Sequence, residues 1–148
     1  MGQGEVSIIA SDHAPHLREE KEKPYQEAPS GVPGLETTLP LLLDAASKGR
    51  LSLQQIAALS AANPAKIFGL QGKGEIRLGF DADFVLVYMK KEHEIDADGL
   101  FTKCKWSPFE GWKLKGKIER VFLRGEQVFD GENIAAKLGR AKHIPAMA

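Results

Sequence analysis

The pattern of apolar and polar positions divides the chain into a short strand, a group of helices and a group of longer strands. Residues 6–10 form a nearly continuous apolar run rich in β-branched residues, which predicts a strand covered on both faces. The run stops at the polar residues 11–16, where Pro15 prevents helical continuation, so these residues are predicted to form a loop. Residues 18–34 follow as a long irregular connection, of the kind that often serves as a binding loop or lid.

Helical spacing begins after this connection. Apolar residues spaced i, i+3, i+4 and i+7 predict a helix that starts near Thr38, because Pro40 is tolerated only in the first turn. Gly49 is expected to end this helix. Its apolar face consists of Leu39, Leu42, Leu43 and Ala46.

Two further helices are predicted downstream. Ser52 and Gln55 have the spacing of a capping box and predict the start of the second helix. Asn63 followed by Pro64 predicts the N-cap and first position of a short third helix, which Gly69 would stop.

The period becomes extended after Gly72. Residues 75–78 and 83–88 are predicted to be extended, and residues 117–123 and 126–129 to form a hairpin around a glycine-containing turn. The connection between these strands has no clear period. Its aromatic residues are expected to cover a core or an internal interface; they are Phe101, Trp106, Phe109 and Trp112.

These elements predict an α/β chain in two portions, residues 1–72 with a strand and helices and residues 73–148 with a small β module. The strand at residues 6–10 has no parallel neighbour in the sequence, so we expect its partners to lie outside the chain. Self-association is the expected way of covering unpaired edges. A complete (β/α)8 barrel needs roughly 250 residues, and 148 residues cannot contain one.

Composition removes several classes of function. Lys+Arg and Asp+Glu number 20 each, and the resulting net charge of zero gives no electrostatic footprint for nucleic acid or an anionic membrane. The chain shows neither a membrane-length apolar stretch nor a signal-peptide pattern, so a cytoplasmic location is expected. The single cysteine, Cys104, excludes a Cys-rich metal site, so any metal would be held by carboxylates and imidazoles.

Candidate chemistry lies in the polar loop after residue 10. Asp12 stands just beyond the predicted strand and can ligate a metal ion or accept a proton from water; the alternative is an aspartate that caps the next turn. His13 and His16 are three residues apart, but the extended backbone at Pro15 points their rings in different directions. One of them could bind a substrate carboxylate instead. Residues 28–34 offer main-chain N–H groups near a helix start.

Five motifs carry a resemblance to a known family. They are residues 10–16 (ASDHAPH), 28–37 (APSGVPGLET), 63–70 (NPAKIFGL), 79–83 (GFDAD) and 106–111 (WSPFEG). In this order they resemble the C-terminal third of the type I dihydroorotases of the amidohydrolase superfamily. His16 is the discriminating residue, because the related hydantoinases and allantoinases share the Ser-Asp-His opening but usually differ at this position.

The resemblance implies a fold and an activity. The fold would be the C-terminal fragment of a metal-dependent TIM-type (β/α)8 barrel, followed by part of a small β-sandwich. The activity would be the zinc-dependent, reversible hydrolysis of dihydroorotate to N-carbamoyl-L-aspartate in de novo pyrimidine biosynthesis. Asp12 would be the catalytic residue, as zinc ligand and proton shuttle, and His16 would hold the substrate carboxylate. The main chain at Ser30 and Gly31 would contact the pyrimidine ring.

The chain also departs from the family pattern. The family's other zinc ligands are a His-x-His pair, a carboxylated lysine and two further histidines, and none of them is present. Because zinc takes about four ligands, the chain alone is expected neither to bind zinc tightly nor to turn over substrate. The enzymatic interpretation further predicts the mouth of a pocket beside Asp12.

Two other functions are compatible with the same residues. The substrate could be a hydantoin or another cyclic amide, as in hydantoinases and allantoinases. The chain could instead be a non-catalytic, dihydroorotase-like partner of aspartate transcarbamoylase.

Overall fold

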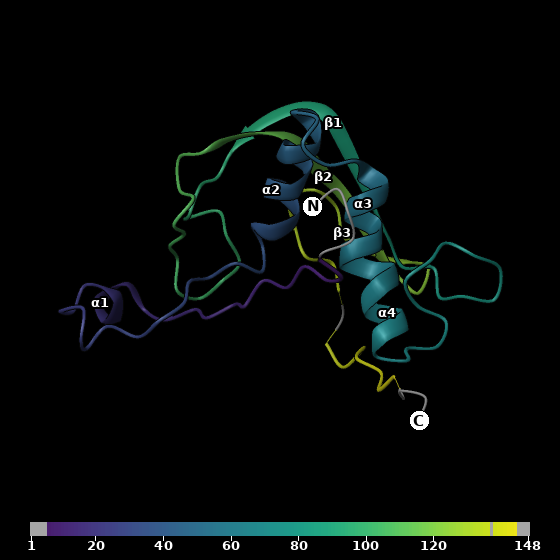
Figure 1. Cartoon of the computed structure of the whole chain (residues 1–148), viewed down its shortest axis with the longest axis horizontal. Coiled ribbons are helices and arrows are strands. Elements are labelled where there is room, and N and C mark those ends of the chain that lie inside the picture. The colour runs from purple at the N-terminus through teal and green to yellow at the C-terminus, as the bar shows by residue number, and fades with distance from the viewer. Residues whose placement is uncertain (1–5, 137, 145–148) are drawn as a thin grey trace.

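The computed structural model describes residues 6–136 and 138–144, in which helices pack against an antiparallel sheet (Figure 1). The sheet has the strand order β1-β2-β3. The helical elements are α1 (Arg18–Lys21), α2 (Thr38–Ser47), α3 (Leu53–Ala57), the π-helical turn η1 (Ala58–Ala62) and α4 (Asn63–Ile67), and the strands are β1 (Phe84–Glu94), β2 (Lys113–Leu123) and β3 (Glu126–Phe129). The predicted portions extend to residues 1 and 148, but residues 1–5, 137 and 145–148 lie outside the described part.

The predicted hairpin is confirmed as β2 and β3, which pair antiparallel. Arg124 and Gly125 form its turn with φ angles of 51° and 79°, the left-handed pair that a two-residue hairpin favours. Strand β1 pairs with β2 from Phe84 opposite Phe122 to Glu94 opposite Lys113, with two register shifts. The sheet is therefore longer than the sequence pattern predicted, because β1 continues six residues past residue 88.

Helix α2 begins at Thr38 as predicted and packs against β2. Leu43 is the centre of this contact and is only 2% exposed. Opposite it, Gly116 has φ +104°, and a Cβ built there would lie 2.8 Å from the Cβ of Leu43. The close approach of α2 to the sheet therefore depends on the absence of a side chain at residue 116.

The helices α3, η1 and α4 follow one another without a break, so the predicted N-cap at Asn63 is wrong. Asn63 has helical φ and ψ, and its N–H donates to the carbonyl of Ala58, five residues back. Pro64 has no N–H and crowds the preceding turn, and a π turn accommodates such a residue without ending the helix. The capping box of Ser52 and Gln55 is confirmed at the start of α3.

The predicted strand at residues 6–10 does not form within the described residues. The Ile9 N–H donates to the carbonyl of Leu59 in η1, at 3.0 Å, and the Ser7 carbonyl accepts the side-chain amide of Asn63, at 2.9 Å. No strand among the described residues lies beside this segment, and its main chain bonds to helical residues instead. Residues 75–78, also predicted to be extended, form no strand and leave Ile76 and Leu78 exposed. None of the described helices has the length and apolar character needed to cross a membrane.

Candidate functional site

Two segments far apart in the loop-rich N-terminal part come together, and we call residues 11–16 and 30–36 the loop pair. His13 and Val32 form an isolated parallel bridge, and the Ala14 N–H donates to the Val32 carbonyl at 3.0 Å. A Cβ at Gly31, which has φ +90°, would lie 2.6 Å from the Cβ of Ala14. The two loops thus touch where the sequence placed candidate substrate contacts.

Asp12 lies at the turn of the first loop with φ +46° and is exposed. Aspartate tolerates this left-handed conformation better than most residues. Asp12 lines neither of two cavities in the structure. One is a large apolar cavity between the helices and β1, and the other is a small cavity between His13, Glu36 and Thr102. The mouth of a pocket that the sequence analysis predicts beside Asp12 is therefore not provided by either of these cavities.

The described residues do not by themselves fit a zinc ion. They contain no group of three His, Cys, Asp or Glu side chains placed to hold a metal, whereas zinc in proteins takes at least three protein ligands. Asp12 can contribute one carboxylate. A metal role for Asp12 stays a prediction that depends on ligands beyond the described residues.

His13 has a structural role in the loop pair. Its Nδ1 accepts the main-chain N–H groups of both Gly34 and Leu35, each at 3.2 Å. An accepting Nδ1 places the proton of the neutral ring on Nε2. With its Nδ1 engaged in this way, His13 fastens the second loop to the first.

His16 is held differently from His13. Its N–H donates to the Ala14 carbonyl at 2.9 Å across Pro15, in the manner of a γ-turn. Its Nδ1 lies 3.9 Å from a carboxylate oxygen of Glu20 in α1, and its side chain is 38% exposed. The ring is therefore accessible to a small anionic ligand.

Ser30 and Gly31 lie directly before the bridge at Val32. Ser30 is exposed and Gly31 is half-buried. The positive φ of Gly31 and its contact with Ala14 place this stretch of main chain against the first loop. The four predicted site residues thus sit on two loops that touch, although no described cavity encloses them.

Two residues that sequence analysis did not single out as site residues connect the β module to the loop pair. Glu36 accepts the N–H groups of Phe101 and Thr102 with its two carboxylate oxygens, at 2.8 and 2.7 Å. The indole N–H of Trp106 donates to the His16 carbonyl at 2.7 Å. These contacts join residues that are 65 and 90 positions apart in the sequence, so no local sequence pattern could have predicted them.

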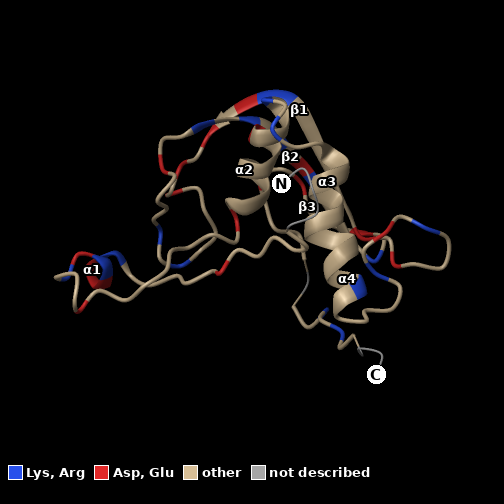
Figure 2. Cartoon of the chain, in the orientation of Figure 1, with Lys and Arg blue, Asp and Glu red and all other residues tan. Residues whose placement is uncertain are grey.

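Charge around the loop pair is mixed. Figure 2 shows both signs on α1, which projects from the body of the molecule with the connection on either side of it. A guanidinium nitrogen of Arg18 lies 3.4 Å from a carboxylate oxygen of Glu110. Glu110 follows Trp106 in the aromatic connection, the segment between β1 and β2. Lys21 donates to the Pro29 carbonyl at 2.5 Å. These contacts join α1 both to Pro29, directly before the second loop, and to the β module.

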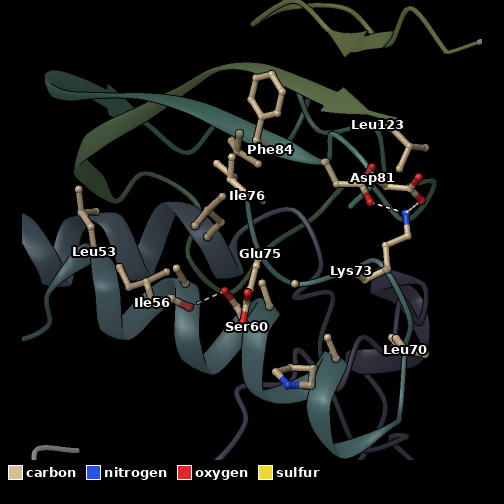
Figure 3. Close-up of a pocket in the computed structure, with 18 of the residues that line it drawn as sticks. Leu53, Ile56, Ser60, Leu70, Lys73, Glu75, Ile76, Asp81, Phe84 and Leu123 are labelled. Carbon is tan, nitrogen blue, oxygen red and sulfur yellow. Dashed lines mark hydrogen bonds and ion pairs between the residues drawn. The ribbon is translucent and has the colours of Figure 1, made fainter. Parts of the chain in front are cut away.

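The large cavity has a volume of about 690 Å³ and is lined by none of the loop-pair residues. It lies between the helices and β1 and is mainly apolar, with Leu53, Ile56 and Phe84 among its walls (Figure 3). At its rim Lys73 contacts Asp81 at 2.7 Å and Asp83 at 2.5 Å.

At the cavity rim, Lys73 and Asp81 stabilise each other's charged forms. Burial lowers the pKa of Lys73, but the hydrogen bonds to Asp81 and Asp83 outweigh it and the pKa is raised overall. The pKa of Asp81 is lowered, chiefly by its hydrogen bond from Lys73. Lys73 is therefore a charged structural tie within residues 72–83 and is not poised to act as a base, and Asp83 in turn accepts the main-chain N–H of Arg124 in the hairpin turn at 2.7 Å.

Comparison with known proteins places these features in a family context. The model of the amidohydrolase family matches residues 4–128. A dihydroorotase from Pyrococcus furiosus is 50% identical over 132 residues, 89% of this chain and 31% of the relative. A dihydroorotase from Halobacterium salinarum is 48% identical over 140 residues, 95% of this chain and 33% of the relative. The chain thus spans about a third of the length of these curated relatives.

Solved structures of hydantoinases are also similar. The L-hydantoinase (dihydropyrimidinase) from Arthrobacter aurescens has a TM-score of 0.87 and 33% identity, covering 90% of this chain and 31% of that one. A D-hydantoinase has a TM-score of 0.87 and 32% identity, covering 94% of this chain and 32% of that one.

Proposed function

The chain belongs to the amidohydrolase family, and we propose that it is part of a dihydroorotase, the enzyme that interconverts dihydroorotate and N-carbamoyl-L-aspartate in de novo pyrimidine biosynthesis. The observation that carries this proposal is the 50% identity to a dihydroorotase over 89% of the chain. The similar hydantoinase structures are only 32–33% identical. His16, which the resemblance assigns to the carboxylate of an acidic substrate, lies on an accessible part of the loop pair.

Each site residue receives a role under this proposal. Asp12 is the proton acceptor and a metal ligand, His16 binds the substrate carboxylate, and the main chain of Ser30 and Gly31 contacts the ring. Support comes from the contact of the two loops, because Gly31 packs against Ala14, two residues before His16. A hydrogen-bonding imidazole and main-chain N–H groups are suitable partners for a carboxylate and ring carbonyl groups.

Zinc enters only as a proposal about a larger assembly. The described residues supply one candidate carboxylate, so the remaining ligands would have to come from beyond the described residues. The chain's own contribution is to place a proton acceptor and an anion-binding imidazole on one loop, and the main-chain N–H groups of Ser30 and Gly31 on a second loop that contacts it.

The architecture of that assembly is also a proposal. Residues 6–10 would become the last strand of a (β/α)8 barrel when neighbouring strands are present, and β1, β2 and β3 would form part of a β-sandwich. One edge of β1 pairs with no other described strand, and an apolar cavity lies between β1 and the helices. Both support this arrangement, since both offer surface for further elements. The cytoplasmic location, self-association and any partnership with aspartate transcarbamoylase stay predictions.

A chimera tests the activity. The chain would replace the matching third of the Pyrococcus furiosus dihydroorotase, and both directions of the dihydroorotate reaction would be assayed together with hydantoin hydrolysis. We expect activity on dihydroorotate that Asp12→Asn abolishes. His16→Ala should raise KM for dihydroorotate and leave hydantoin hydrolysis unaffected. If the unsubstituted chimera preferred hydantoin, the chain would instead be assigned to the hydantoinases, the class of the similar solved structures.

A further inference from the structure

One hydrogen bond joins the aromatic connection of the β module to the residue proposed to bind substrate. The indole N–H of Trp106 donates to the main-chain carbonyl of His16 at 2.7 Å, across 90 positions of sequence. The distance is short for an N–H···O bond, and Trp106 itself is half-buried. The bond reaches the main chain of His16 and does not involve its imidazole side chain, which is 38% exposed.

The bond completes the restraint of His16. The His16 N–H already donates to the Ala14 carbonyl across Pro15, so with Trp106 both main-chain polar groups of His16 are engaged. Fixing the main chain on both sides of a Cα fixes the direction of its Cβ, from which the side-chain rotamers start. The Nδ1 atom of the ring faces Glu20 at 3.9 Å, which further limits these rotamers.

The residues on both sides of Trp106 are held in place by hydrogen bonds and burial. Four residues before it, Thr102 is bonded to a carboxylate oxygen of Glu36. Cys104 and Ser107, on either side of Trp106, are buried, and Ser107 accepts the N–H of Phe109. Because the chain is held both before and after Trp106, the position of its indole N–H is fixed relative to the β module. A mobile surface tryptophan could not fix His16 in this way.

We propose that Trp106 is a positioning residue for His16, and that through this bond the β module sets the affinity of the site for the carboxylate of an acidic substrate. This inference rests on the proposed function. It predicts a selective effect on the binding of dihydroorotate, because Trp106 touches the support of the imidazole and no reacting group. Loss of the bond should therefore raise KM and spare kcat.

The chain provides a matched control for the substitution. Trp112 lies in the same connection, is 53% exposed and packs edge-on against Phe109 with ring centroids 5.2 Å apart. Its indole N–H makes no hydrogen bond to another described residue. Trp112→Phe thus removes an indole of the same size without touching the loop pair, whereas Trp106→Phe removes the donor to His16.

The first experiment uses the 148-residue chain and NMR. In Trp106→Phe, amide hydrogen exchange at residues 16–18 should quicken about tenfold, as expected for the loss of one hydrogen bond, and the His16 ring should sample more than one rotamer. Exchange within β1 and β2 should not change. Unchanged exchange and rotamers at His16 would overturn the proposal, as would the same changes in Trp112→Phe.

A second variant covers the case in which Trp106→Phe fails to fold. Replacement of Trp106 by benzothienylalanine keeps the shape of the bicyclic ring and lacks the N–H. The same change at His16 is expected from this analogue, with native thermal unfolding. A His16 signal indistinguishable from the unsubstituted chain would show that packing alone holds the loop.

Kinetics of the chimera give the functional readout. Trp106→Phe should raise KM for dihydroorotate about tenfold with kcat within twofold, and hydantoin hydrolysis should stay unchanged, as should both activities in Trp112→Phe. An equal loss of kcat on both substrates, or no change in KM, would overturn the proposal. An unsubstituted chimera without dihydroorotase activity contradicts the proposed function, and the NMR comparison then still decides whether Trp106 controls His16.

Discussion

The carboxylate of Asp44 in α2 accepts the main-chain N–H of Lys115 in β2 at 3.1 Å. Its other oxygen accepts the ammonium group of Lys48 at 2.5 Å. Asp44 is 9% exposed, and it joins the helical portion of the chain to the sheet beside the Leu43–Gly116 contact. The two portions predicted from sequence are therefore tied together by a charged group at their apolar interface.

Stability should depend on the ionisation of Asp44. Its hydrogen bond from Lys48 is the main reason that its pKa is lowered from the ordinary value of 3.8; burial opposes this and the Lys115 N–H adds to it. A lowered folded-state pKa contributes stability above the unfolded value, and this is lost as pH falls through the folded value. Asp44→Asn should cost about 1 kcal/mol near neutral pH, with a smaller cost below about pH 4. Urea unfolding at several pH values measures this difference.

The matched control for Asp44 is Asp98→Asn, at an exposed position. It should leave stability unchanged across the same pH range. A cost for Asp44→Asn that stays constant from neutral pH to pH 3 would contradict the ionic role of the carboxylate.

The contact of α2 with β2 should be sensitive to one added methyl group. Gly116→Ala places a Cβ 2.8 Å from that of Leu43 at φ +104°, so backbone strain and overpacking add to a cost of about 2–4 kcal/mol. Gly111→Ala is the control, because its φ is +76° and its added Cβ would meet nothing within 4 Å. It should cost about 1 kcal/mol. Equal costs in thermal unfolding would show that the approach of Leu43 does not matter.

The loop pair should depend on the Nδ1 atom of His13. His13→Ala removes the acceptor of the Gly34 and Leu35 N–H groups and should destabilise the chain by about 1 kcal/mol, with faster amide exchange at these two residues. Long-range proton–nitrogen NMR should find the neutral ring protonated on Nε2. His143→Ala, at an exposed position, serves as the control. A ring protonated on Nδ1 in its neutral form would be incompatible with this arrangement.

The chain alone should bind zinc weakly. Asp12 offers one carboxylate, and no three ligating side chains gather among the described residues, so the affinity should fall far below that of a structural zinc site. Elemental analysis after dialysis should find well under one zinc per chain, and dihydroorotate should not be hydrolysed. Stoichiometric zinc that Asp12→Asn removes would show that the chain holds a complete site.

Local sequence was sufficient for the elements whose signals lie within a few residues. The Ser52–Gln55 capping box, the helix start at Thr38 and the Arg124–Gly125 turn are confirmed because each depends on short-range hydrogen bonds or on a φ angle. The motifs around Asp12 and Gly31 likewise indicated the family, since family membership is carried by residue identity. The roles of Asp12, His16, Ser30 and Gly31 remain predictions.

Tertiary structure decided whatever depends on a distant partner. Residues 6–10 have the composition of a strand, but a strand forms only beside another strand, and here Ile9 bonds to Leu59 of a helix. Asn63 looks like an N-cap, yet the π turn carries the helix through Pro64 and frees its side chain for Ser7. The contacts of Glu36 with Phe101 and of Trp106 with His16 have no sequence signal, because only packing brings residues 65 and 90 positions apart within hydrogen-bonding distance.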